Sequence, residues 1–293
     1  FLVREMLQKK ADANWTIKLG LLASFVALFI SSVFYYANFT LSFTAWLMMG
    51  AFVFLTTKDY KALSFKEGTR SAIGRLSVVA VLLMVIIGFL FVGGQRYLAE
   101  VQYAEGVAMA GEGSIDGGIA NILMAAEVSP EMDNYWRDLS QLYLIRANQV
   151  ITDTKIKEEE RVQITEALLA RSVEAANQAT NAAPMNVANW TVRGFIYRSL
   201  GGVKGAHDFS IESYQKATQL EVYSAFNWTE LGRAYLLKVD ALETKAEKDA
   251  ALKKALESLE MALSVQSDYG PPNYLIAWTY EAQGRTNEAI GKL

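Results

Sequence analysis

Hydrophobic and polar positions follow two different patterns along the chain. Up to about residue 96 the apolar residues stand in long unbroken runs, whereas the following residues are rich in Ala, Glu, Gln, Lys and Tyr. In that second part the apolar residues recur with the three-to-four-residue spacing of an amphipathic helix. The pattern therefore predicts an all-α chain, with a transmembrane region over residues 1–96 and a second helical region over residues 97–293.

Three apolar runs in the first region are candidate membrane spans. They cover Leu19–Tyr36, Thr40–Thr57 and Leu76–Gly94, and none has a charged residue inside it. A helix needs about 20 apolar residues to cross the hydrocarbon core of a bilayer. Leu76–Gly94 meets this requirement best, and Thr40–Thr57 is marginal. The alternative is that the runs are buried helices in the core of a soluble protein.

Basic residues predict how the spans are oriented. The turn between the first two spans, at Ala37–Thr40, has no charge, whereas basic residues flank the hairpin on both sides. Cytoplasmic loops carry an excess of Lys and Arg. We therefore expect an integral membrane protein with a cytoplasmic N-terminus, a cytoplasmic 58–75 loop and an extracytoplasmic region after about residue 96. The basic residues are Arg4, Lys9, Lys10 and Lys18 before the first span, and Lys58, Lys61, Lys66, Arg70 and Arg75 before the third.

The second region matches a repeating 34-residue pattern of two antiparallel helices, in which the first helix reads W-x2-L-G-x2-Y. The clearest copy is NWTELGRAYL, where Trp228, Leu231, Gly232 and Tyr235 stand at the positions of the pattern. NWTVRGFIYRSL and YWRDLSQLYL match with one substitution each, AEGVAMAGEG is a weaker first copy, and YLIAWTYEAQGRTNEAIGKL is an incomplete last one. We count about four and a half repeats, and three or more normally bury a continuous core.

Small and large residues of this pattern have a packing role. Gly or Ala at the eighth position of the first helix, and Ala in the second helix, let the two helices approach closely. The large residues fill the space between hairpins, so we interpret Trp190, Trp228 and Tyr235 as structural. Two charged insertions, TDTKIKEEERVQITEALL and DALETKAEKDAAL, indicate lengthened helices with solvated faces, and GGVKGAHD is a short glycine-containing insert.

The first helices of such repeats line the concave face of a superhelix. Their outward positions are about the second, fifth, ninth and twelfth of each repeat. Arginines, amides and aromatic rings at these positions could hold an extended peptide or an acidic group. The alternative is that they are ordinary surface residues. The candidate groove residues are Asn134, Arg137, Gln141, Thr191, Phe195, Arg198, Thr229, Arg233, Tyr274 and Trp278.

Composition argues against most catalytic and metal chemistry. The chain has no cysteine, which rules out thiolate nucleophiles and Cys-based zinc sites, and its only histidine is His207. His207 stands beside Asp208 in the glycine-containing insert, and we interpret it as a solvated loop residue rather than a general base. The net charge of −3 gives no reason to expect nucleic acid. We predict no catalytic residue, cofactor, metal or nucleic-acid partner; the expected partners are a protein or peptide and the membrane.

Two family resemblances follow from these features. From about residue 98 to the end, the repeat copies resemble the tetratricopeptide-repeat (TPR) family, which implies a right-handed α-solenoid and a role in protein–protein interaction or assembly. The whole chain, with its apolar hairpin, basic loop, further span and repeats such as NVANWTVRGFIYRSLGGVKGAHDFSIESYQKA, resembles the C-terminal end of bacterial O-antigen ligase or polymerase-like (Wzy-type) membrane proteins with a TPR tail.

The second resemblance implies a function only for the longer protein. That family transfers glycans from a lipid carrier in the outer leaflet, with its active-site residues in earlier spans and in a large extracytoplasmic loop that this sequence does not contain. The chain would then be the non-catalytic end of a cell-envelope glycan ligase or polymerase. The alternative is a stand-alone membrane-tethered TPR scaffold for envelope complex assembly, and a structural homo-oligomer is a third hypothesis. Because the sequence begins with Phe1 and ends at Leu293 inside an expected helix, we expect a piece of a longer protein.

Overall fold

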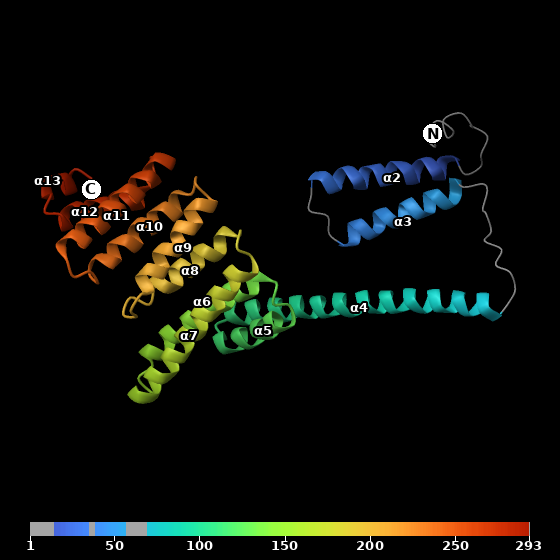
Figure 1. The fold of residues 1–293 in the computed structure, drawn as a ribbon, viewed down its shortest axis with the longest axis horizontal. Coiled ribbons are helices and arrows are strands. Elements are labelled where there is room, and N and C mark those ends of the chain that lie inside the picture. Colours follow the sequence, from blue (N-terminus) through green and yellow to red (C-terminus); the bar gives the residue numbers. More distant parts are fainter. Residues whose placement is uncertain (1–14, 35–38, 57–68, 293) are drawn as a thin grey trace. The chain divides into compact units, whose positions relative to one another are not determined.

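The computed structural model describes residues 15–34, 39–56 and 69–292, and every element in these ranges is a helix (Figure 1). The chain divides into two compact units, Phe1–Val81 and Leu82–Leu293. The helices are α2 (Trp15–Phe34), α3 (Phe39–Thr56), α4 (Thr69–Gly111), α5 (Ile115–Val128), α6 (Asp133–Thr152), α7 (Glu158–Ala182), α8 (Val187–Arg198), α9 (Ala206–Leu220), α10 (Ala225–Val239), α11 (Lys245–Val265), α12 (Gly270–Ala282) and α13 (Thr286–Ile290).

In the first unit, α2 and α3 are apolar helices that pack on each other as a hairpin. They contain the first two predicted spans except Tyr35, Tyr36 and Thr57, which lie outside the described residues, as does the 58–75 loop up to residue 68. By length and composition, one helix among the described residues could cross a membrane, and it begins at Leu76 within α4. The three-span topology remains a prediction.

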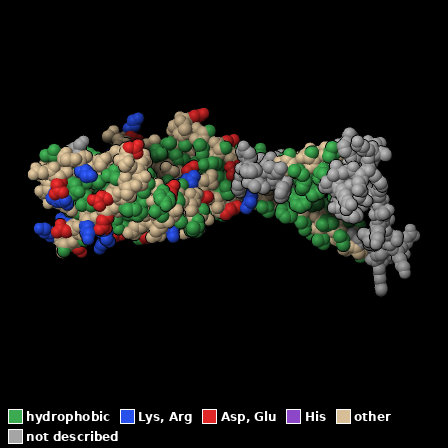
Figure 2. Space-filling model, turned by 90° about the horizontal axis from the view of Figure 1, so that it is seen from above, with side chains coloured by type: hydrophobic (Ala, Val, Ile, Leu, Met, Phe, Trp, Pro, Cys, Tyr) green, Lys and Arg blue, Asp and Glu red, His purple; other side chains and the backbone are tan. Residues whose placement is uncertain are grey.

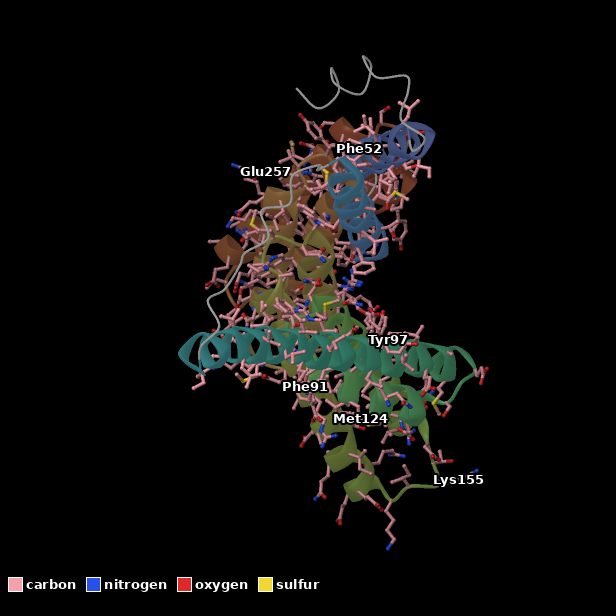
Figure 3. All side chains as sticks on the ribbon, turned by 90° about the vertical axis from the view of Figure 1, so that its right-hand side faces the viewer. Phe52, Phe91, Tyr97, Met124, Lys155 and Glu257 are labelled. Carbon is pink, nitrogen blue, oxygen red and sulfur yellow. The ribbon has the colours of Figure 1, made fainter. Side chains whose placement is uncertain are left out.

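Helix α4 is 43 residues long and belongs to both units. No residue in its most apolar stretch is buried, and side chains project outward from the helix around Phe91 (Figure 3). The same helix continues without a break into the repeats, where Ala99 is buried against α5 and α6. The predicted boundary between residues 96 and 97 therefore lies within a continuous helix.

In the second unit the helices follow one another as antiparallel hairpins. The end of α4 pairs with α5, and the next pairs are α6 with α7, α8 with α9, α10 with α11, and α12 with the five-residue α13. Charged side chains are scattered over these helices (Figure 2), as expected for amphipathic elements that bury one face. The predicted fold of consecutive TPR-like helical hairpins is thus confirmed.

The hairpin that contains the first charged insertion has longer helices than the hairpin after it. Helices α6 and α7 have 20 and 25 residues, whereas α8 and α9 have 12 and 15. Glu158, Glu159 and Glu160 form the exposed first turn of α7, where carboxylates interact favourably with the positive end of the helix dipole. The insertion therefore extends the hairpin rather than forming a separate loop.

The glycine-containing insert differs from the sequence prediction. Gly205 has a φ of 83°, a left-handed conformation that glycine adopts without steric cost, and α9 starts directly after it. Ala206 is then buried, and His207 is the half-buried second residue of the helix rather than a loop residue. The prediction of a solvated loop histidine was wrong because the glycine turn ends earlier than the insert does.

Two repeated contacts explain the TPR pattern. A Cβ atom on Gly194 would lie 2.8 Å from Tyr214, and one on Gly232 would lie 2.6 Å from Leu259, so larger residues would push the paired helices apart. The indole nitrogens of Trp136, Trp190 and Trp228 each donate to a backbone carbonyl six residues earlier, at 2.8–2.9 Å. Each of these tryptophans links its first helix to the preceding turn by a hydrogen bond. This supports the interpretation of Trp190 and Trp228 as structural residues.

Candidate peptide-binding groove

The predicted groove residues lie on α6, α8, α10 and α12, the first helices of successive hairpins. α6 contacts α8, and α10 contacts α12, so these helices share one side of the solenoid. Their exposure differs from residue to residue. Asn134, Arg137, Gln141, Thr191, Arg198 and Arg233 are half-buried; Phe195, Tyr274 and Trp278 are exposed; and Thr229 is buried.

A pocket of about 360 Å³ opens between α6, α8, α9 and α10. Four predicted groove residues line it together with four that the sequence did not suggest, and most of its surface is apolar. We call it the α8–α10 pocket. Its lining residues are Gln141, Thr191, Val192, Phe195, Arg198, Tyr214, Phe226 and Glu230.

Charge in the pocket centres on Glu230. Its side chain is 9% exposed and forms an ion pair with Arg198 of the preceding hairpin. Its other oxygen, Oε1, lies 3.2 Å from Nε of Arg233. Burial lowers the pKa of Arg198, and the nearby positive charge of Arg233 lowers it further. The Glu230 carboxylate thus pairs with two guanidinium groups, and the cluster of Arg198, Glu230 and Arg233 has a net positive charge.

Two phenylalanines form the rim. Phe195 on α8 and Phe226 on α10 are 40% and 50% exposed. The guanidinium carbon of Arg198 lies 5.4 Å from the ring centroid of Phe195, a cation–π contact that orients both groups. Tyr214 lies beneath them, and burial raises its pKa to about 12, so its hydroxyl is neutral at physiological pH.

Arg137 is held by its own chain. Its Nε lies 3.5 Å from Oδ1 of Asp138, and its Nη1 lies 3.8 Å from Oδ2 of Asp133. Nη1 also donates to Oδ1 of the buried Asn189 on α8, at 3.4 Å. Arg137 therefore joins α6 to α8, and its charge is balanced by two neighbouring carboxylates.

Thr229 does not line an accessible surface. It is buried, and its hydroxyl donates to the carbonyl oxygen of Ala225 at 2.7 Å within α10. Thr191, the corresponding residue of the previous repeat, lines the pocket and donates to Oδ1 of Asn227 at 2.9 Å. The counted position therefore faces the pocket in one repeat and the interior in the next.

A second exposed set lies on α12. Tyr274 and Trp278 are four residues apart, on one face of the helix, with 66% and 41% of their surfaces exposed. Neither lines the α8–α10 pocket. They form a separate aromatic surface on the last hairpin.

Sequence analysis missed several lining residues, for different reasons. Phe226 stands at the second position of its repeat, and the same positional count would have included it. Tyr214 comes from a second helix and reaches the pocket across Gly194. Glu230 stands at the sixth position, where the pattern gives no reason to expect a groove residue.

Within the residues that the structure describes, no cluster of three or more His, Asp or Glu side chains could hold a metal ion. For the chain as a whole, the absence of a metal site remains a prediction.

Comparison with known proteins relates the fold to TPR proteins. A crystal structure of MamA protein aligns with a TM-score of 0.50 and 16% identity, covering 67% of this chain and 87% of that one. This similarity shows a TPR-type fold and nothing about the ligand. No protein-family model matches the sequence, and no curated protein matches it.

Two other solved structures have lower scores. MamA residues 41 to the end from Desulfovibrio magneticus RS-1 aligns with a TM-score of 0.49 and 10% identity, covering 66% of this chain and 90% of that one. TTC0263, a thermophilic TPR protein in Thermus thermophilus, gives 0.43 and 16%, covering 66% and 87%.

Proposed function

We propose that the chain is a membrane-anchored scaffold that binds a protein or peptide partner through the α8–α10 pocket. The observation that supports this most is the exposure of Phe195 and Phe226 around an apolar pocket lined by the Arg198–Glu230 ion pair, with the half-exposed Arg233 beside Glu230. Aromatic residues and arginines are enriched at protein interfaces.

Membrane anchoring is supported by α4. The residues from Leu76 to Gly94 form a continuous helical run with no charge and no burial. A run of this length matches the thickness of the hydrocarbon core. Arg96 is the one basic residue in the first turns after the run, against five between residues 58 and 75. By the positive-inside rule, this difference favours an extracytoplasmic location of the repeats.

The identity of the longer protein is the finer part of the proposal. We infer that the chain is the non-catalytic C-terminal region of an O-antigen ligase or polymerase-like protein, in which the repeats recruit a partner to a catalytic membrane domain. The order of apolar hairpin, basic loop, apolar helix and repeats supports this. The sequence encoded upstream of Phe1 tests it: several further spans with a large loop would support a ligase, and an adjacent start codon would support a stand-alone scaffold.

Site-directed photo-cross-linking tests the binding function. A benzophenone amino acid replaces Phe195 in the pocket or, as the control, Tyr223, which is 88% exposed in the turn between α9 and α10. We expect a discrete cross-linked product from the Phe195 position and none from Tyr223. Equal labelling at both positions would show that the pocket has no special affinity.

Compartment-sensitive reporters test the topology. One reporter is fused after Leu293 and another is inserted between residues 58 and 68. We expect the first to report the extracytoplasmic side and the second the cytoplasm. A cytoplasmic signal after Leu293 would rule out an extracytoplasmic scaffold and, with it, the relation to glycan ligases.

A further inference from the structure

The apolar run of α4 ends very close to the first hairpin. Gly94 is the last residue of the run, and Ala99 is already buried in the hairpin core with 1% exposure. The step from Gly94 to Ala99 covers about 7.5 Å of helix, at 1.5 Å of rise per residue. Because Leu82–Gly94 belongs to the same compact unit as the repeats, no flexible linker separates them.

Helix α5 runs back along α4 toward the end of the apolar run. Gly106 of α4 lies against Ile122 of α5, where an added Cβ would be 2.6 Å from Ile122 Cγ1. Further back, Nη2 of Arg96 donates to Oε1 of Glu131 at 3.0 Å. The turn between α5 and α6 therefore lies at the level of Arg96, immediately beyond the apolar run.

Exposed apolar side chains gather at this level. Tyr97 and Leu98 on α4 are 70% and 60% exposed, and Val128 at the end of α5 is 48% exposed. Met124 is also exposed, but it lies one turn before Val128 in α5 and therefore about 5–6 Å farther from the apolar run. Figure 3 shows Tyr97 on α4 and Met124 on the adjacent helix. We call Tyr97, Leu98 and Val128 the base surface.

We propose that the base surface lies in the phospholipid headgroup layer and contacts lipid directly. The proposal rests on the proposed membrane span. The hydrocarbon core is about 30 Å thick and the whole bilayer about 40–45 Å, which leaves a layer of about 5–8 Å on each side. Arg96, at the level of the α5–α6 turn, lies about 3 Å beyond Gly94, and Ala99 lies about 7.5 Å beyond it, so both fall within that layer. Tyrosine is enriched at this depth because its ring is apolar and its hydroxyl is polar.

The charges near the base surface indicate which lipid it accepts. Glu100, Glu127 and Glu131 are exposed around it, and Arg96 is the opposing cation. This excess of carboxylates repels anionic headgroups and is compatible with zwitterionic ones. Phosphatidylcholine vesicles are therefore the appropriate probe.

Single-cysteine labelling tests the proposal, since the native chain has no cysteine. The full chain is reconstituted in phosphatidylcholine vesicles, and a small fluorophore is attached to a Val128→Cys or a Val222→Cys variant. Val222 is also a valine with 48% exposure, but it lies between α9 and α10. A Phe91→Cys variant is the depth reference, and a Leu98→Cys variant is a second reporter for the base surface.

We expect brominated lipid to quench the label at residues 91, 98 and 128 but not at 222, and aqueous iodide to quench residue 222 several-fold more strongly than 128. Equal iodide quenching at 128 and 222, with bromolipid quenching at 91 alone, would overturn the lipid contact and leave the membrane span intact. Absence of bromolipid quenching at residue 91 would instead overturn the membrane anchoring on which the proposal rests.

Discussion

The hydrogen atom that serves as the side chain of Gly194 makes room for the ring of Tyr214. A Cβ at residue 194 would lie 2.8–2.9 Å from three ring carbons of Tyr214, closer than carbon atoms pack. The ring is 1% exposed and forms the floor of the α8–α10 pocket. One glycine thus sets both the spacing of α8 and α9 and the depth of the pocket.

Gly194→Ala should therefore destabilise the repeats. Overpacking of this kind costs about 1–3 kcal/mol, although alanine recovers up to about 1 kcal/mol through its better helix propensity. Urea unfolding followed by circular dichroism measures the difference. Gly111→Ala is the control, because an added Cβ there meets no atom within 4 Å. A loss of stability at residue 111 as large as that at 194 would contradict the packing explanation.

Trp190→Phe should remove the bond between the indole nitrogen and the carbonyl oxygen of Pro184, which is 2.8 Å long. A single hydrogen bond of this kind contributes about 1 kcal/mol, and the ring volume is largely kept. The midpoint of urea unfolding should fall accordingly, while partner cross-linking at Phe195 should persist. Loss of cross-linking without loss of stability would assign Trp190 to binding instead.

Glu230→Ala should leave Arg198 and Arg233 without their shared carboxylate. Removing one partner of a largely buried ion pair costs about 3–5 kcal/mol, because the remaining charge is uncompensated. The matched control is Glu257→Ala, whose carboxylate is exposed and lies 3.9 Å from Nζ of Lys253. Exposed pairs of this kind contribute less than about 1 kcal/mol. Similar unfolding midpoints for the two variants would show that Glu230 is not essential to the cluster.

Acid should loosen the start of α11. Hydrogen bonds from the Thr244 side chain and backbone lower the pKa of Glu247 below its ordinary 4.5. A carboxylate whose pKa is lowered by folding stabilises the folded state above its unfolded pKa, and that contribution is lost as the pH falls through the lowered value. Amide protection in the first turn of α11 should therefore decrease below pH 4.5 and stay constant with pH in a Glu247→Gln variant.

The capping box explains why this turn responds and gives a second check. The Thr244 hydroxyl accepts from the backbone N–H of Glu247 at 3.2 Å, and the Glu247 carboxylate accepts from the N–H of Thr244. A Thr244→Ala variant should show weak protection at neutral as well as acidic pH. If protection in that variant still falls in acid, another group is responsible.

Sequence predicted the helical hairpins well, because the pattern encodes local contacts. Trp190 and Trp228 each mark a first helix and bond to the turn six residues earlier, so a single residue type reports both the helix and its entry. Gly232 marks the close approach of α11. Contacts of this kind depend on neighbours within one repeat, which the sequence shows directly.

The groove was predicted less completely, because it depends on contacts between repeats. Phe195 and Arg198, two of the predicted groove residues, line the pocket, whereas Thr229 is buried. Positional counting assumes that every first helix presents the same face, but neighbouring hairpins cover that face to different extents. Glu230 was missed because its role comes from Arg198, a residue of the preceding hairpin.

Because α4 is continuous, the number of residues in it also fixes how the repeats are rotated about its axis. Each residue turns an α-helix by about 100°, so one residue inserted between Gly94 and Ala99 would rotate all following hairpins by that angle about the helix axis. The direction in which the α8–α10 pocket faces is then set by the number of residues between Gly94 and Ala99. Inserting or deleting a residue there would change the direction in which the pocket faces, without altering any residue that lines it.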